Sequence, residues 1–149
     1  MPADPEQLES YLKEHIPAAR GLGVRVLEST PGRVILEAPL GPNVNHMRSA
    51  FGGSVASLAT LAGWCLVHVR LREMGVEADI VIQRSAMEFI APAQSDFTAT
   101  CVPADDGAWT RLARGVARYG RGRIHLDVSV EAGGGPVGSF QGAYVALRP

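Results

Sequence analysis

The sequence is short of cysteine and has no excess of charge of either sign, and both shortages exclude classes of function. It holds two cysteines, Cys65 and Cys101, and fourteen Lys and Arg against fifteen Asp and Glu, a formal net charge of -1. Two isolated cysteines predict small buried side chains in a reducing compartment, and no Cys and His cluster is close enough to predict a metal site. The balanced charge argues against nucleic-acid binding through bulk charge.

The first residues lack the features of a secretory signal. Residues 1–6 are acidic and polar, with neither a basic start nor an apolar centre, so we expect a cytoplasmic location. A length of 149 residues is most simply one domain, 1–149, that buries a hydrophobic core. Within it, residues 1–20 are expected to form an N-terminal helix that precedes the core.

Formal charge is also absent between Arg48 and Arg70. That length could span a bilayer, but the segment is rich in Gly, Ser and Thr and poor in the residues that drive insertion. A buried helix covered by a sheet explains the pattern better, because small side chains let strands approach closely. With Gly75 as a natural stop, the sequence predicts a helix from Phe51 to Met74, about 35 Å long at ~1.5 Å per residue.

The rest of the chain predicts one short helix and several strands. Apolar residues at a helical period, after an Asp-Pro-Glu start, predict an amphipathic helix over Pro5–Ile16. A Pro-Gly turn separates two predicted strands, Val24–Ser29 and Arg33–Pro39. From residue 76 onward the chain reads as strand to its end, 112–119 included, with a strict alternation over Ile124–Glu131.

One long helix with about six mainly antiparallel strands has few packing solutions. The sheet must curl around the helix to cover its apolar surface. The predicted class is therefore α+β with the hotdog architecture.

The most site-like stretch runs from Asn45 to Ser54, where a loop with a glycine pair opens onto the long helix. The first backbone N–H groups of a helix lack intrahelical acceptors, and the helix dipole favours a carbonyl or an anion there.

The chain resembles hotdog-fold acyl thioesterases, most closely the YiiD C-terminal type, which also occurs fused behind an acetyltransferase domain. The resemblance covers about residues 20–147. It is carried by Asn45-His46, Phe51-Gly52-Gly53-Ser54, Leu58-Ala59, Ala62-Gly63-Trp64, Leu66-Val67-His68, Ala78-Asp79-Ile80-Val81-Ile82 and Asp96-Phe97-Thr98-Ala99. It implies an acyl-CoA or acyl-carrier thioester as substrate and no cofactor or metal. It also implies a homodimer or dimer of dimers with the site at the subunit interface.

The resemblance assigns roles to the glycine pair and to Asn45. Related thioesterases carry His-Gly-Gly at the helix start, where this chain has Phe51, Gly52 and Gly53. A backbone N–H of the glycine pair would polarise the thioester carbonyl, and one such donor is worth ~2.7–4 kcal/mol. Asn45 matches an Asn that positions the attacking water or the carbonyl. The plainer alternatives are a tight turn into a helix and an Asn that stabilises a turn.

The chain departs from its relatives at Thr60, where they place an Asp or Glu. A threonine is no useful base near pH 7, although Thr60, or Ser57 one turn earlier, could hold a water. Alternatively, such hydroxyls bond back to the helix. His46 is then the first candidate for a general base, unless it is a surface loop histidine.

The strand after the long helix offers further contacts to a substrate. Gln83, Ser85 and Glu88 are the candidates, with Asp79 as a second acid. Alternation places Gln83 and Ser85 on one face and Glu88 on the other, provided that no bulge intervenes. His68 is expected near the surface end of the helix, and His125 on a solvated strand face.

Five arginines make one later segment basic: Arg111, Arg114, Arg118, Arg121 and Arg123. They either form a solvated strand face or bind the phosphates of coenzyme A.

Two functions from different classes follow. The first is a thioesterase that hydrolyses its substrate by water attack. The second is a non-catalytic acyl-thioester binding module, as Thr60 suggests. A hotdog hydratase is a weaker third, because no Asp and His pair lies at the helix entry.

Overall fold

A computed structural model describes residues 4–149 of the chain, so the first three residues of the predicted N-terminal segment lie outside it. The elements, in order, are α1 (Pro5–His15), α2 (Pro17–Leu22), β1 (Arg25–Thr30), β2 (Arg33–Ala38), a 3-10 turn (Gly41–Asn43), α3 (Gly52–Glu73), β3 (Asp79–Phe89), β4 (Phe97–Cys101), α4 (Asp106–Tyr119), β5 (Arg121–Ala132) and β6 (Gly135–Leu147).

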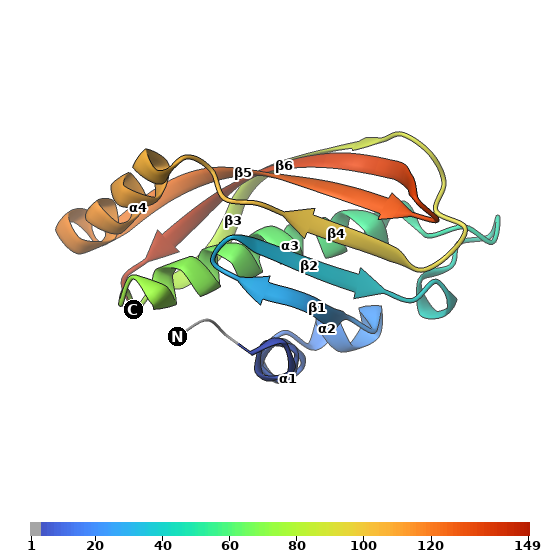
Figure 1. Cartoon of the computed structure of the whole chain (residues 1–149), viewed down its shortest axis with the longest axis horizontal. Coiled ribbons are helices and arrows are strands. Elements are labelled where there is room, and N and C mark those ends of the chain that lie inside the picture. Colours follow the sequence, from blue (N-terminus) through green and yellow to red (C-terminus); the bar gives the residue numbers. More distant parts are fainter. Residues whose placement is uncertain (1–3) are drawn as a thin grey trace.

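The six strands form one sheet in the order β1-β2-β4-β5-β6-β3, and every neighbouring pair is antiparallel. Figure 1 shows the sheet curving along α3, with α1 and α2 beside β1. This arrangement confirms the predicted hotdog fold and the predicted number of strands. Because β1 and β3 lie at the two ends of the order, each has one edge without a partner strand among residues 4–149.

The long helix α3 is the centre of the core. Half of its residues are buried, and Tyr144 of β6 packs against it closely enough that its hydroxyl donates a hydrogen bond to the Thr60 carbonyl at 2.7 Å. Gly63 makes this approach possible, because a Cβ there would lie 2.1 Å from that hydroxyl oxygen. By length and composition α3 could cross a membrane, but 61% of its apolar window is buried inside the protein, as in the core helix of a soluble protein.

The segment 112–119 is a helix, so the prediction of strand there is wrong. The Asp105 side chain accepts a hydrogen bond from the Ala108 N–H at 2.8 Å, which caps the start of α4. Trp109, Leu112 and Val116 are buried, a spacing of three and four residues that places them on one face of a helix. Gly120, with φ +78°, ends the helix.

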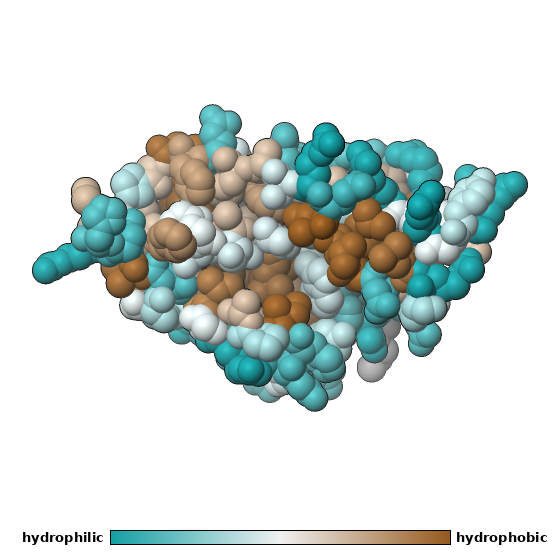
Figure 2. Space-filling model, turned by 180° about the vertical axis from the view of Figure 1, so that it is seen from behind, coloured by the Kyte–Doolittle hydropathy of each residue, from teal (hydrophilic) through white to brown (hydrophobic). Residues whose placement is uncertain are grey.

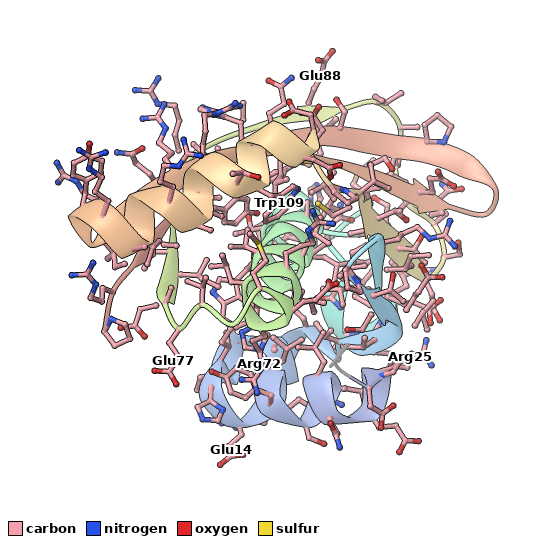
Figure 3. All side chains as sticks on the ribbon, turned by 60° about the vertical axis from the view of Figure 1, so that its left-hand side comes forward. Glu14, Arg25, Arg72, Glu77, Glu88 and Trp109 are labelled. Carbon is pink, nitrogen blue, oxygen red and sulfur yellow. The ribbon has the colours of Figure 1, made fainter. Side chains whose placement is uncertain are left out.

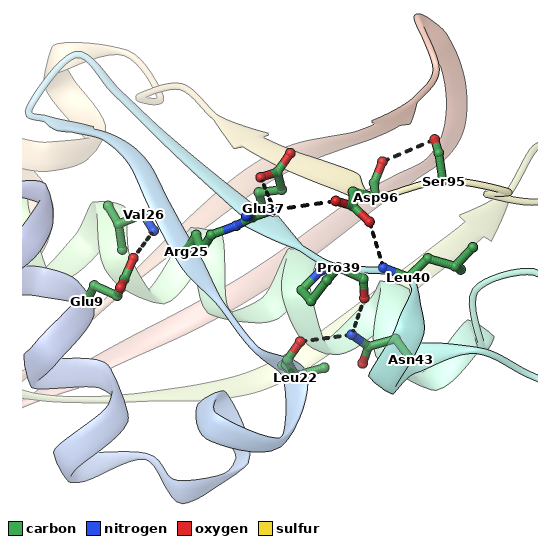
Figure 4. A network of polar contacts seen from close by, with 10 residues as sticks. All are labelled: Glu9, Leu22, Arg25, Val26, Glu37, Pro39, Leu40, Asn43, Ser95 and Asp96. Atoms are coloured by element: carbon green, nitrogen blue, oxygen red, sulfur yellow. Dashed lines mark hydrogen bonds and ion pairs between the residues drawn. The ribbon is translucent and has the colours of Figure 1, made fainter.

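A polar network fixes the chain before the candidate site (Figure 4). The buried Asn43 donates hydrogen bonds to the carbonyls of Leu22 and Pro39, each at 2.8 Å. Asp96 accepts from the Leu40 N–H at 2.9 Å. These bonds join the end of α2, the segment that follows β2 and the residue that precedes β4, next to the loop that leads to α3. Sequence reasoning missed this role of Asn43.

Both cysteines are fully buried and unpaired, as predicted. Burial raises the pKa of the Cys65 thiol, and raises that of Cys101 to about 12.

Candidate functional site

The loop that precedes α3 is organised around the side chain of Asn45. Its Oδ1 accepts from the Met47 N–H at 2.8 Å and the Ser49 N–H at 3.1 Å, and its Nδ2 donates to the Ser49 hydroxyl at 3.0 Å. The backbone closes the same loop, since the Asn45 N–H donates to the Ser49 carbonyl at 2.7 Å. The Asn45 amide is thus engaged within its own loop and sets the loop's shape.

The start of α3 presents two backbone donors without acceptors. The N–H groups of Ser54 and Val55 donate to the Phe51 carbonyl at 2.9 and 3.1 Å, and the Phe51 N–H donates to the Asn43 carbonyl at 2.7 Å. Among residues 4–149, the N–H groups of Gly52 and Gly53 have no acceptor. They lie at the positive end of a helix of 22 residues.

Two phenylalanine rings flank this glycine pair. A Cβ at Gly53 would lie 2.4 Å from Cε2 of Phe51, and a Cβ at Gly52 would lie 3.3 Å from Cζ of Phe89. Both rings are more than half exposed. A side chain at residue 53 would therefore have to displace the Phe51 ring, and the two rings form apolar walls around the free N–H groups.

The glycine pair also separates two hollows. Gly52 lines a cavity of about 330 Å³ with Phe89, Ile90 and Asn45. Gly53 lines another of about 400 Å³ with Phe51 and Ser57. Among residues 4–149, no carboxylate or imidazole lines either cavity, so both suit an uncharged group more than a charged one.

Thr60 lies two turns into α3 and lines neither cavity. Its hydroxyl donates to the Ala56 carbonyl at 2.8 Å, the back-bonded arrangement that was the plainer alternative. Gly52, Ala56 and Thr60 follow one another at four-residue spacing along the partly exposed side of the helix. α3 carries no Asp or Glu before Glu73.

The remaining predicted residues are spread over the molecule. His46 is exposed and lines neither cavity at the glycine pair. Ser85 and Glu88 lie opposite Gly142 and Ser139 in the register of β3 and β6, hence on opposite faces of the strand.

The prediction that Gln83 and Ser85 share one face of the strand is wrong, because β3 has a bulge between Ile82 and Arg84. Gln83 accepts a hydrogen bond from Arg123 at 3.1 Å, on the outer face of the sheet, whereas Ser85 follows the inner register. The condition on the prediction, that no bulge intervenes, is not met.

The far end of α3 holds an aromatic cluster that sequence reasoning missed. The rings of Tyr11, Trp64 and His68 lie 4.9 to 6.2 Å apart in nearly parallel planes, beside a cavity of about 530 Å³. Burial, and secondarily the charge of Arg72, lower the pKa of His68 to about 4. The four-residue spacing of Trp64 and His68 was the available signal.

Comparisons with known proteins agree with this architecture. The model of one family, described as "Putative thioesterase (yiiD_Cterm)", matches residues 5–148. A solved structure of a protein of unknown function from Chlorobaculum tepidum TLS is 26% identical over 97% of both chains, with a TM-score of 0.91. A "putative thioesterase" from Shewanella oneidensis is 24% identical over 96% of both chains, with a TM-score of 0.83.

A more distant match is the E. coli PaaI protein from the phenylacetic acid degradation operon. It is 17% identical, covering 97% of this chain and 94% of that chain, with a TM-score of 0.70. At this identity the likeness concerns the fold.

Proposed function

Because the chain belongs to the yiiD C-terminal thioesterase family, we propose that it binds an acyl thioester at the start of α3 and hydrolyses it. The observation that carries the proposal is the pair of N–H groups at Gly52 and Gly53, which have no acceptor among residues 4–149. These donors are fixed in place before any substrate arrives, which is what stabilisation of an oxyanion requires.

The proposed chemistry is attack of water on the thioester carbonyl. The carbonyl oxygen accepts from the glycine N–H groups, and the helix dipole favours the negative charge that develops on it. The water oxygen forms a bond to the carbonyl carbon, and the carbon–sulfur bond breaks. The acid and the thiol are the products. His46 is the proposed general base: it accepts the proton of the attacking water and passes it to the departing thiolate, which leaves as the thiol.

We propose further that the site is completed in a homodimer formed through β3. This eleven-residue strand pairs only with β6, so its other edge is open. Val81, Phe89 and Ile90 expose about half of their surface along it, and Figure 2 shows apolar atoms gathered in the middle of this side of the molecule. A long open edge with apolar side chains favours pairing with a second chain.

Twofold pairing of two β3 strands is antiparallel. The Phe89 end of one copy, with its glycine pair, then lies beside the Asp79 end of the other. The partly exposed side of the second copy's α3, which carries Thr60, would thereby close the cavity at Gly52.

The absence of a carboxylate favours a second candidate, a module that binds an acyl thioester without hydrolysing it. Neither cavity at the glycine pair contains an acid or a histidine, and the Thr60 hydroxyl is bonded to its own helix. Such a site would hold the carbonyl but lack a group to activate water.

Release of free thiol from acyl-CoA substrates of increasing chain length distinguishes the two candidates, with calorimetry of the same compounds as amide analogues. Hydrolysis that falls at least tenfold in Asn45→Ala supports the thioesterase. Binding without turnover supports the module. Neither binding nor turnover with any acyl group would overturn both.

A further inference from the structure

Positive charge is concentrated in one segment of this chain. Residues 107–126 contain five arginines and no Asp or Glu, whereas the rest of the sequence holds nine Lys and Arg against fifteen Asp and Glu, a formal charge of -6. We call the surface formed by Arg111, Arg114 and Arg118 on the exposed side of α4 the arginine face; Arg121 and Arg123 follow on β5 and lie on the outer face of the sheet. All five side chains are exposed. A nearly neutral protein thus carries a strongly basic surface on an acidic body.

The arginine face is held rigidly by the packing of α4. Trp109 is buried beneath the helix and donates to the Ala104 carbonyl at 3.2 Å. Arg148 donates to the Val116 carbonyl at 2.8 Å near the other end of the helix. At Gly115 the helix approaches β5 so closely that a Cβ would lie 2.7 Å from the Arg121 carbonyl oxygen. The position of the helix that carries the arginine face is therefore fixed by the core.

Most of the charge on this face is not neutralised within the protein. Arg114 and Arg118 form no ion pair among residues 4–149, and the Arg111 guanidinium lies 4.0 Å from the exposed Asp105 carboxylate. Figure 3 shows nitrogen-tipped side chains directed away from α4 into solvent, on the side of the helix opposite Trp109. Like charges that gather without partners repel one another and lower stability, so their presence here favours a binding role.

We propose that the arginine face docks an acidic carrier domain that presents the acyl thioester on a phosphopantetheine arm. The inference rests on the proposed function only in that the ligand is a thioester, and it does not require hydrolysis. It names the carrier that sequence reasoning left open between coenzyme A and a carrier protein.

The extent of the surface favours a protein over coenzyme A. Arg111 and Arg118 lie seven residues apart, about 10 Å along the helix axis, so the charges of the arginine face are spread along α4. The exposed side of a helix is convex, and none of the cavities that we describe contains an arginine of this face. A nucleotide would need a hollow for its base, whereas carboxylates on another protein surface can match a spread array.

The remaining charge disfavours nucleic acid as the occupant. A body of charge -6 repels the continuation of a long polyanion beyond the basic segment, but it does not oppose a compact acidic domain that touches the arginine face alone.

In the proposed dimer, the arginine face of one copy lies near the glycine pair of the other copy. Asp79 and Arg121 both lie opposite Leu147 in the sheet, with β6 between them, so about two strand spacings, ~10 Å, separate them. In the proposed dimer the Asp79 end of one copy neighbours the glycine pair of the other. The phosphopantetheine arm of a carrier that is docked on α4 then reaches the glycine pair of the other copy by passing over the edge of the sheet.

Calorimetry with a bacterial acyl carrier protein tests the proposal. The probe carries a butyryl group in amide linkage on its arm, so that turnover plays no part, and the matching butyryl-amide analogue of coenzyme A is measured beside it. We expect Arg114→Glu/Arg118→Glu to weaken carrier binding at least tenfold and to flatten its salt dependence, while leaving the coenzyme A analogue unchanged. Arg20→Glu, at another exposed arginine, on α2, is the control and should leave both affinities unchanged.

The possible outcomes separate this proposal from the proposed function. Carrier binding that is absent in the wild type, or equal in the wild type and the double variant, would overturn the docking surface. An equal loss for the carrier and for the coenzyme A analogue would overturn it in favour of coenzyme A phosphates. Tighter binding of a duplex DNA through the same arginines would overturn it in favour of nucleic acid. Failure of hydrolysis in any variant bears only on the proposed function.

Discussion

The ring of Phe51 lies over the backbone of Gly53, so that a Cβ at residue 53 would be 2.4 Å from Cε2 of the ring. A side chain at residue 53 would therefore have to displace the Phe51 ring. The contact between Phe51 and Gly53 thus links the position of the Phe51 ring to that of the free N–H groups of the glycine pair.

Gly53→Ala should displace either the Phe51 ring or the first turn of α3, and lower kcat/KM at least tenfold. Gly41→Ala is the control, because nothing lies within 4 Å of a Cβ there. Adding Phe51→Ala to Gly53→Ala should restore much of the melting temperature, since the clashing ring is removed. Equal kcat/KM and melting temperature in the two glycine variants would show that the ring does not constrain the site.

Asn45→Ala should destabilise the loop by about 1 kcal/mol, because it removes the side-chain acceptor of two backbone N–H groups. Asn45→Asp keeps that acceptor and loses only donation to Ser49, so its stability should stay closer to wild type. Urea unfolding and thiol-release kinetics of both variants provide the check. A loop-shaping role fails if Asn45→Ala loses activity while its unfolding midpoint equals that of wild type.

The contact between Tyr144 and α3 predicts two different losses of stability. Tyr144→Phe removes the hydrogen bond to the Thr60 carbonyl and should cost about 1 kcal/mol. Gly63→Ala places a methyl group 2.1 Å from the Tyr144 oxygen and should cost about 3 kcal/mol or more, since the buried helix cannot shift freely. Denaturant unfolding measures both, and a smaller loss for Gly63→Ala than for Tyr144→Phe would contradict the packing described.

His68 should make stability fall in acid. Its pKa in the folded protein, about 4, lies below the ordinary value of 6.5, so between these values the unfolded chain binds more protons than the folded one. The free energy of unfolding should therefore decrease as pH falls from about 6.5 to 4. His68→Phe keeps an aromatic ring beside Tyr11 and Trp64 but cannot titrate.

Urea unfolding at pH 7, 5.5 and 4.5 measures this dependence in wild type and His68→Phe. The variant should lose less stability across the range, and parallel pH profiles would contradict a buried neutral histidine. Arg72, Glu77 and Asp79 line the same cavity, and both proteins retain them, so their charges cancel in the comparison.

Local pattern was enough to predict much of the fold. The uncharged run that forms α3 is too long for a strand and fits a buried helix, and the alternation over Ile124–Glu131 matches the period of a strand. In contrast, 112–119 is helical although its apolar residues alone predict a strand, because Trp109 and the Asp105 cap, which lie before it, complete the helical spacing. The bulge at Gln83 leaves no periodic signal, since one extra residue merely shifts the alternation.

The site was predictable only in part, for a similar reason. The glycine pair and Asn45 are close in sequence and lie at a helix start, which a motif can encode. Phe89 reaches Gly52 from 37 residues away, and Asn43 ties together elements that meet only in the folded chain. Contacts of this kind depend on strand order, which no local pattern specifies.

The backbone amide signals of Gly52 and Gly53 provide the most direct test of the proposed thioester site. A ketone analogue of acetyl-CoA, in which a methylene group replaces sulfur, is titrated into ¹⁵N-labelled protein. Both amide protons should move downfield along one binding curve, because each donates to the ketone oxygen. Binding of the analogue with these two signals unmoved would show that the carbonyl is held elsewhere and would contradict the proposed site.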